Sequence, residues 1–392
     1  MCPAIAEASR YTSPLQLSTR KPAEQRRACY KHQVRPIALL LSLVLLQSPS
    51  ALFQSSSALP PTRDQLLSLF GAYFEALRQQ AGIPGMAAAI VGDTDIIWDQ
   101  GFGLQDIGNG IATRADTPFH FDGLTQPLTA TILLRCMEEG RLHLDVPLSQ
   151  YLGSAPEPNA TVAQLLSHTS GPPTNQTFSY NLARLEPLKA LMPACFDRSF
   201  RQAFRDLLLD RLAMVDSMPG PDAALPSLPP AELATPADAD RYNRVLMRLA
   251  APYAVSAQGT TGSHYSVTTL GAGTGLISTV RDFAKFDLAL RQGILVRVDT
   301  LAAAWTPPVG SNGLPLPHGM GWFVQSYNGE PLVWQFGSDT NASSSLLLTL
   351  PARGLTLILV ANSDGLAKPA SLVAGDITVS PFARVFLGLV VK

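Results

Sequence analysis

The residues that could carry chemistry gather at residues 119–130, where a polar turn runs into an apolar-periodic segment that ends at a glycine. This spacing predicts a helix that begins just after the turn. Unpaired backbone N–H groups and the positive end of the helix dipole meet at such a start, which favours a nucleophile or an anion. Yet the turn contains Gly123, Leu124, Thr125 and Gln126, and only Thr125 carries a hydroxyl group. The position suits nucleophilic catalysis, but the side chains that such catalysis needs are missing.

Other chemistry-bearing residues lie where a structural role is expected. His168 ends a short predicted helix at 161–171, so we expect capping or packing rather than general-base catalysis. His264 and His318 lie in loops, with no nucleophile at a recognisable spacing. The glycines of residues 271–275 imitate a phosphate-binding loop, but no Lys-Ser/Thr follows, which favours a tight turn before a helix. The sequence contains no G-x-S-x-G motif, the turn that carries the nucleophilic serine of α/β-hydrolases. The sequence therefore gives no support for an α/β-hydrolase.

The cysteines give no metal-binding pattern. Cys2, Cys29, Cys136 and Cys195 form no C-x-x-C pair and no zinc-type spacing with histidine, so we expect no metal and no cofactor. Cys136 and Cys195 lie in the part of the chain that is expected to fold. A disulfide between them is one alternative, and two separate buried small hydrophobic side chains is the interpretation that we favour.

Composition indicates a folded protein without a nucleic-acid partner. The 392 residues are 46% hydrophobic and 15% charged, which is typical of a globular chain. The net charge of −1 provides no electrostatic argument for binding nucleic acid. The 32 prolines favour a loop-rich protein with rigid connections.

The N-terminal region has the pattern of an export signal. Seven lysine and arginine residues precede a largely apolar run at 36–46, which is too short for a comfortable membrane span. Small residues follow, and cleavage after Ala51 or Ala58 fits the pattern. The alternative is an uncleaved anchor formed by residues 36–52. We therefore expect an exported protein, periplasmic or extracellular, in which residues 1–58 are a leader, a signal peptide or anchor, and a linker.

Strand patterns occur at both ends of the remaining chain, with helical patterns between them. We predict strands over residues 86–91, 96–104, 321–325, 332–336, 344–350 and 355–362. This arrangement predicts an α+β fold in which the N- and C-terminal strands share one antiparallel sheet flanked by helices. We assign 63–366 to this domain, with an irregular, mostly helical insertion at about 175–265 and a C-terminal extension at 367–392.

Several segments, in this order, resemble the serine β-lactamase and penicillin-binding-protein-like hydrolases, especially their class C and esterase-like branch. The resemblance covers about residues 63–366, and its pieces lie at residues 82–85, 101–103, 138–152, 165–171, 275–282 and 319–322. Each piece alone is weakly specific, and their shared order carries the resemblance. It implies a β-lactamase/transpeptidase-like fold.

The resemblance also implies three catalytic motifs, and the first is degenerate here. The family uses S-x-x-K at a helix start, because the lysine must approach the serine hydroxyl to influence its proton. The matching positions hold Gly123 and Gln126. Glycine offers no atom to acylate, and glutamine cannot act as a base. Both parts of the acylation machinery are therefore missing.

The other two motifs are degenerate as well. The family's Tyr-x-Asn has its nearest match in Tyr180 and Asn181, which are adjacent rather than separated by one residue. A tyrosine at a subdomain interface is the competing interpretation for Tyr180. The family's K-T-G or H-x-G triplet matches Gln335, Phe336 and Gly337, where the glycine is kept and the cation is lost. The glycine leaves room for a backbone beside the strand.

These observations predict a catalytically impaired or inactive, exported member of this group. Such a pseudoenzyme would bind a small-molecule or peptide ligand in the vestigial pocket, or bind a partner, or serve as an envelope scaffold. The alternative is an active hydrolase, esterase or peptidase with a displaced nucleophile, either Thr125 or Ser338. Thr125 lies two positions from the family's serine, so its side chain would point about 200° away on a helix. We expect membrane contact only through the N-terminal segment.

Overall fold

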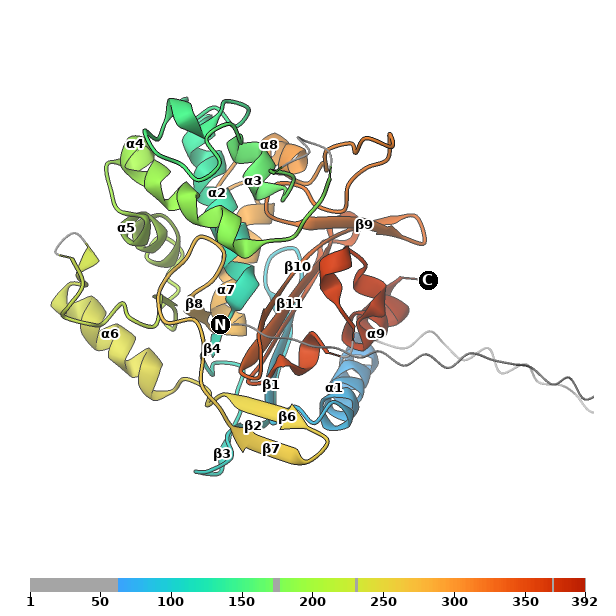
Figure 1. Ribbon diagram of the computed structural model, residues 1–392. Helices are drawn as coiled ribbons and strands as arrows, with labels where there is room; N and C mark the ends of the chain where they lie inside the picture. The colour runs from blue at the N-terminus through green and yellow to red at the C-terminus, as the bar shows by residue number, and fades with distance from the viewer. Residues whose placement is uncertain (1–62, 172–176, 230–231, 369, 392) are drawn as a thin grey trace, which may run out of the picture. The chain divides into compact units, whose positions relative to one another are not determined.

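A seven-stranded antiparallel sheet forms the centre of the fold (Figure 1). The computed structural model describes residues 63–171, 177–229, 232–368 and 370–391; the expected leader, signal and anchor lie outside this part. The strand order is β3-β2-β1-β12-β11-β10-β9. The strands are β1 (Gly85–Val91), β2 (Ile96–Asp106), β3 (Ile111–Ala112), β9 (Phe323–Tyr327), β10 (Glu330–Asp339), β11 (Ser343–Leu350) and β12 (Leu355–Ala361). The predicted α+β architecture, with N- and C-terminal strands in one antiparallel sheet, is confirmed.

The two ends of the domain meet in the middle of this sheet. Met86 of β1 pairs with Ala361 of β12, and the antiparallel register continues to Val91 opposite Thr356. Short turns join the C-terminal strands. The β9–β10 turn is typical, because Asn328 and the glycine after it have φ angles of 49° and 80°, which suit a two-residue hairpin turn.

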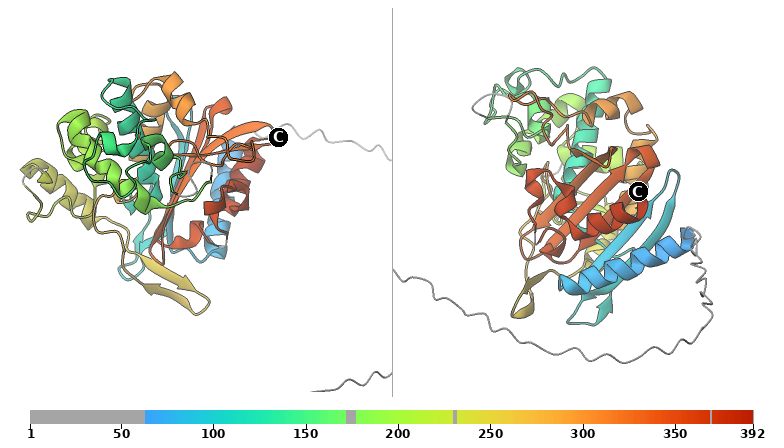
Figure 2. Two further views of the ribbon diagram at one scale, coloured as in Figure 1. Left: turned by 45° about the horizontal axis from the view of Figure 1, so that its top comes forward. Right: turned by 90° about the vertical axis from the view of Figure 1, so that its right-hand side faces the viewer.

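Helices cover both faces of the sheet, as Figures 1 and 2 show. Successive β1 side chains enter two different cores: Ala87 and Ala89 face one, while Ala88 and Ile90 face the other. The first core contains residues of α2 (Thr125–Glu138) and α7 (Val280–Arg291), and the second contains residues of α1 (Arg63–Gln80) and α9 (Pro381–Val390). Because α9 lies within residues 367–392, this segment packs into the second core.

The region between the two strand groups is mainly helical. It contains η2 (Leu148–Gln150), α3 (Val162–Leu166), η3 (Leu182–Leu191), α4 (Met192–Phe196), α5 (Phe200–Phe204), a π-helical turn η4 (Arg205–Leu209), α6 (Pro236–Met247) and α8 (Val298–Ala304). Short strands also occur there. These are β4 (Phe119–His120), β5 (Met218–Pro219) and β8 (Leu276–Ser278) in one small sheet, and the hairpin of β6 (Tyr253–Ser256) and β7 (Gly259–Gly262). Among the described residues, no helix combines the length and the apolar character that crossing a membrane requires.

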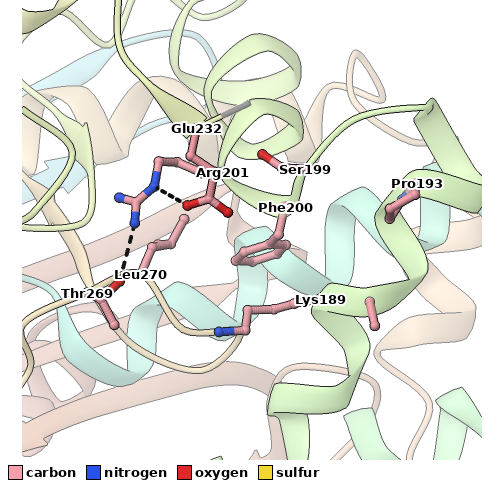
Figure 3. Close-up of a pocket in the computed structure, with 9 residues that line it drawn as sticks. Lys189, Pro193, Ser199, Phe200, Arg201, Glu232, Thr269 and Leu270 are labelled. Atoms are coloured by element: carbon pink, nitrogen blue, oxygen red, sulfur yellow. Dashed lines mark hydrogen bonds and ion pairs between the residues drawn. The ribbon is translucent and has the colours of Figure 1, made fainter. Parts of the chain in front are cut away.

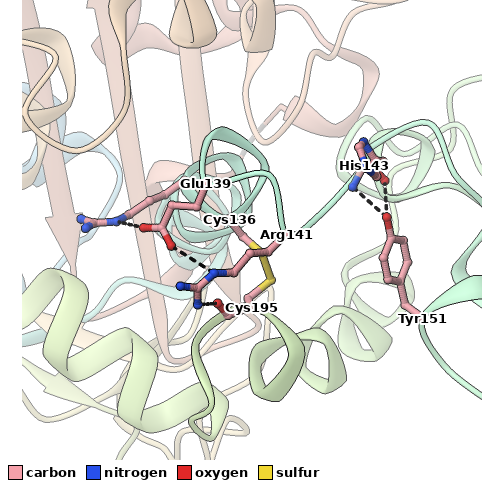
Figure 4. Close-up of a disulfide and its surroundings, with 7 residues drawn as sticks. Cys136, Glu139, Arg141, His143, Tyr151 and Cys195 are labelled. Atoms are coloured by element: carbon pink, nitrogen blue, oxygen red, sulfur yellow. Dashed lines mark hydrogen bonds and ion pairs between the residues drawn. A yellow bond between two sulfur atoms is a disulfide. The ribbon is translucent and has the colours of Figure 1, made fainter.

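A disulfide joins the central helix to the helical region (Figure 4). Cys136 lies near the end of α2 and Cys195 in α4, 59 residues further on. Arg141 donates a hydrogen bond of 2.5 Å to the Cys195 carbonyl oxygen beside it. Our preference for two separate buried side chains is therefore wrong. The reason is that tertiary packing of α2 against α4 brings the two residues together, and no sequence spacing records that packing.

Candidate functional site

The backbone of strand β10 closes the position where the family places its nucleophile. Gly123 lies in the 3₁₀ turn η1 (Asp122–Leu124), which leads directly into α2. A β-carbon added to Gly123 would lie 2.2 Å from the Phe336 carbonyl oxygen and 3.2 Å from the Gly337 Cα. Real β-carbons do not approach backbone so closely. No side chain, serine included, fits at position 123 in this arrangement.

Gly337 makes the same close approach from the other side. A β-carbon added there would lie 2.6 Å from the Gly123 nitrogen, 2.6 Å from the Phe121 oxygen and 2.5 Å from Ser345 Oγ. The room that this glycine leaves beside the strand is therefore occupied by the backbone of η1. The resemblance to the family had implied that substrate would occupy this space.

Gln126, at the position of the family's lysine, is fully buried in a network of neutral groups. Its Nε2 donates to the Tyr180 hydroxyl oxygen at 2.7 Å, and its Oε1 lies 2.8 Å from His168 Nε2. The Asn181 backbone N–H donates to His168 Nδ1 at 3.2 Å, so Nδ1 is the acceptor and Nε2 carries the proton. Burial lowers the pKa of His168 to about 4, which keeps the ring neutral at physiological pH.

Tyr180 and Gln335 complete this network. The Tyr180 hydroxyl lies 3.5 Å from Gln335 Oε1, and burial raises the pKa of this tyrosine above its usual range. Gln335 Nε2 lies 3.2 Å from His318 Nε2 and also donates to the Gly321 carbonyl oxygen. His318 Nδ1 lies 2.6 Å from the Gly319 carbonyl oxygen, so Nδ1 carries the proton and Nε2 accepts. Burial lowers the pKa of His318 well below its usual range.

Aromatic rings pack around this network. The Tyr180 ring stacks on Phe336 with centroids 5.3 Å apart, and it lies 4.6 Å from the His168 ring. Phe178 packs edge-on against Phe323 at 5.7 Å. Among the described residues, no charged side chain bonds to Gln126, Tyr180 or Gln335; Arg184 acts on the network through His168, whose pKa is lowered by burial and further by the charge of Arg184.

The remaining sequence candidates lie apart from this network or have their polar groups in use. Thr125 is buried; its hydroxyl donates to the Asp122 carbonyl oxygen at 2.7 Å and accepts from the Leu276 N–H at 3.2 Å. The Asn181 side chain is exposed and accepts from the Ala183 N–H at the start of η3. Ser338 is exposed on β10, on the opposite side of the strand from Gly337.

The family motifs were matched in the sequence to five residues that the structure places side by side: Gly123, Gln126, Tyr180, Gln335 and Gly337. Sequence reasoning assigned His168 and His318 to scaffold and loop roles, and the structure places both against the glutamines. The spacing of 42 residues between Gln126 and His168 gives no local signal of their contact.

Sequence reasoning also missed Asp122, the residue just before Gly123. It has a left-handed φ of 44° and is 1% exposed. Its Oδ2 accepts from Ser343 Oγ at 2.8 Å, and its Oδ1 has no hydrogen-bond partner within the described chain. Burial raises the pKa of this carboxyl to about 7; the charge of Asp339 adds to the rise and the Ser343 hydrogen bond opposes it.

A cavity of about 330 Å³ lies beside α5, and neither Gly123 nor Gln126 lines it (Figure 3). Its buried cation, Arg201, is already bonded to Asp222 at 2.9 Å, to Glu232 at 3.3 Å and to Thr269 at 3.2 Å. Those contacts satisfy the guanidinium within the protein and indicate a structural role.

Comparison with known proteins places the chain in a family. The β-lactamase family model matches residues 70–377. The chain belongs to the β-lactamase family. This match confirms the resemblance found in the sequence, and it extends into the segment that we assigned to a C-terminal extension.

Individual relatives match over shorter segments. The human mitochondrial serine β-lactamase-like protein LACTB is 28% identical over 102 residues, which cover 24% of this chain and 19% of that protein. Esterase EstB of Burkholderia gladioli is 30% identical over 113 residues, 27% of this chain and 29% of the esterase. The matched segments therefore span less than a third of each relative.

Solved structures of this family support the fold across most of the chain. A penicillin-binding protein homologue from Pyrococcus abyssi has a TM-score of 0.66 at 17% identity, covering 82% of this chain and 77% of that one. A class C β-lactamase from Rhodobacter sphaeroides has a TM-score of 0.59 at 17% identity, covering 75% and 94%. At these identities the likeness establishes the fold alone.

Proposed function

We propose that this protein is an exported, catalytically silent member of the β-lactamase family that serves as an interaction scaffold. One observation supports the proposed loss of catalysis. The Phe336 carbonyl oxygen occupies the space that a side chain at position 123 would need. Acyl-enzyme chemistry requires a hydroxyl at that helix start and a basic amine one turn later. Here the first is sterically closed, and the second is a glutamine bonded to neutral partners.

The hydrogen bonds and ring contacts around Gln126 and Gln335 favour the scaffold over a ligand-binding vestigial pocket. Gln126 and Gln335 are fully buried, and the Tyr180 hydroxyl contacts both. A small molecule or peptide that entered here would have to displace the Tyr180 ring from its stack on Phe336. It would also leave buried amide groups without partners, which is unfavourable.

A displaced nucleophile is the competing hypothesis. The Thr125 hydroxyl already donates and accepts one hydrogen bond each and lies in the interior. Ser338 is accessible, but no base activates it, because its hydroxyl has no hydrogen-bond partner among the described residues. An unactivated serine is a weak nucleophile.

Covalent labelling tests the proposal. The purified protein is incubated with a fluorescent penicillin and, separately, with a fluorophosphonate probe, beside an active class C β-lactamase as the positive control. We expect labelling of the control alone. Labelling of this protein that disappears in Thr125→Val or Ser338→Ala would overturn the proposal and identify the nucleophile. Heat-denatured protein measures non-specific reaction.

Export rests on two features. The basic leader and apolar run are typical of a signal peptide, and disulfides persist mainly in oxidising compartments. If the protein is exported, Cys136 and Cys195 resist alkylation when cells are lysed in a thiol-blocking reagent, and they react only after reduction. Mass spectrometry of the intact protein then gives the mature N-terminus. Two alkylated cysteines before reduction would argue against export.

A further inference from the structure

Three asparagines begin an N-x-S/T motif, the acceptor sequence for N-linked oligosaccharides in exported proteins. Two of these motifs lie within the described residues, Asn159-Ala160-Thr161 before α3 and Asn341-Ala342-Ser343 at the β10–β11 turn. The third begins at Asn175, which lies outside them. An oligosaccharide is bulky and hydrophilic, so a folded protein accommodates it only where the asparagine side chain faces solvent. The surroundings of Asn159 and Asn341 therefore decide whether these motifs fit a modified protein.

Asn159 occupies a surface turn just before α3. The Ala160 N–H donates to the Glu157 carbonyl oxygen at 3.1 Å, which closes the turn around Pro158 and Asn159. The Pro158 and Ala160 carbonyl oxygens accept from the backbone N–H groups of residues 149 and 148, each at 2.9 Å, so the turn is fixed to the preceding loop. The Asn159 side chain is exposed and has no hydrogen-bond partner among the described residues. A substituent on its amide would therefore break no contact of the fold.

Asn341 occupies the turn between β10 and β11. The Ala342 N–H donates to the Asp339 carbonyl oxygen at 2.9 Å and closes this turn. The Asn341 N–H donates to Asp364 Oδ2 at 2.9 Å, and its carbonyl oxygen accepts from Ser263 Oγ at 2.5 Å. These contacts use backbone atoms of Asn341, whereas its side chain is exposed and without a partner in the described part of the chain. The second motif thus also presents a free amide at the surface.

The hydroxyl residues of both motifs are engaged in the folded chain. Thr161 Oγ1 accepts from the Gln164 N–H at 3.1 Å and caps the start of α3. Ser343 is buried, and its Oγ donates to Asp122 Oδ2 at 2.8 Å. A transferase that needs these hydroxyls therefore has to reach them before the chain folds.

We propose that Asn159 and Asn341 carry N-linked oligosaccharides. The donor is a sugar chain linked to a polyprenyl diphosphate, and the asparagine Nδ2 attacks its anomeric carbon. A C–N bond forms, the C–O bond to the diphosphate breaks, polyprenyl diphosphate leaves, and the amide gives up one proton to a base of the transferase. This modification rests on the proposed export, because N-x-S/T motifs are acceptors in proteins that enter the export route.

Peptide mapping of the protein purified from the cells that make it tests both sites. Peptides are analysed by mass spectrometry with their substituents intact, and again after treatment with peptide N-glycosidase. We expect the peptides that contain Asn159 and Asn341 to carry an oligosaccharide that the glycosidase removes. Asn328 is the internal control, because it is exposed in a hairpin turn with a φ of 49°, but Glu330 stands where the motif needs a hydroxyl residue. Its peptide should carry no oligosaccharide.

Variants of the full-length protein, produced in the same cells, show whether the motif itself is read. Asn159→Gln and Asn341→Gln should each increase electrophoretic mobility by the step that one oligosaccharide causes. Thr161→Val should match Asn159→Gln although the asparagine remains, and Thr161→Ser should keep the wild-type mobility, because serine also completes the motif. A bare asparagine at either position would overturn the assignment of that site. An oligosaccharide that survives Thr161→Val would overturn the role of the motif.

The mature N-terminus and the disulfide, measured on the same sample, separate this modification from export. Bare asparagines in a protein that has lost its leader and holds the Cys136–Cys195 disulfide would overturn the modification alone. Bare asparagines together with an intact leader and free thiols would overturn export as well.

Discussion

Replacing Gly123 by alanine is the sharpest test of the closed site, because it adds a single carbon at the former nucleophile position. The added β-carbon would lie 2.2 Å from the Phe336 carbonyl oxygen. Restoring an ordinary contact requires η1 and β10 to separate by about 1 Å. Neither side can yield by a rotamer change, since the Phe336 oxygen and the Gly337 Cα are both backbone atoms.

The expected loss follows from two opposing contributions to the free energy of unfolding. Alanine in place of glycine gains up to about 1 kcal/mol from reduced backbone entropy in the unfolded chain. Overpacking against rigid backbone costs about 3 kcal/mol, the upper part of the usual range. The net destabilisation is about 2 kcal/mol, which corresponds to a fall in Tm of about 4 °C.

Thermal and urea denaturation followed by circular dichroism measure this loss. Gly388→Ala is the matched control, because Gly388 lies in α9 and a β-carbon added there meets nothing within 4 Å. That variant should be as stable as the wild type or slightly more stable. If Gly123→Ala proves as stable as Gly388→Ala, the helix start moves freely away from β10 and the steric argument for inactivity fails.

Three more predictions concern the surroundings of the site. Tyr180→Phe removes the hydroxyl that Gln126 Nε2 bonds at 2.7 Å, so urea denaturation should show a loss of about 1–2 kcal/mol; an unchanged midpoint would contradict the network. Burial raises the pKa of the Asp122 carboxyl to about 7. Between about pH 4 and 7 the folded state therefore holds a proton that the unfolded state has lost. The free energy of unfolding should fall as the pH rises across this range, by up to about 4 kcal/mol. Asp122→Asn should remove that fall, and Tm profiles of equal slope for both proteins would refute the assignment. Reducing the Cys136–Cys195 disulfide, which closes a loop of 59 residues, should cost about 4 kcal/mol and lower Tm, whereas the double serine variant should not respond to reductant.

The sheet was predictable because its signals are local. The apolar run in β10 and the Asn328–Gly329 turn lie within a few residues of each other, and the structure places strands and turn there. Strand patterns at both ends of the chain then predicted one shared antiparallel sheet, and the pairing of β1 with β12 confirms it. Local pattern and segment order together were sufficient for the fold class.

The interior of the site was not predictable in the same way. That Gly123 and Gln126 cannot support acylation follows from their chemistry alone. Which atom fills the space above Gly123 depends on how closely η1 approaches β10, and only the glycine at position 337 hinted at that approach. The pairing of Gln126 with His168 and the disulfide both depend on tertiary contacts between distant segments, so neither left a spacing signal.

The pairing of β1 with β12 has a consequence for how the chain acquires its fold. Met86 finds its partner strand only when Ala361 has been made, so the central ladder of the sheet closes between residues 275 positions apart. At ordinary synthesis rates the first strand therefore waits roughly 15 to 55 s for its partner, with its apolar edge unpaired. The central sheet therefore cannot be completed until β12 has been synthesised.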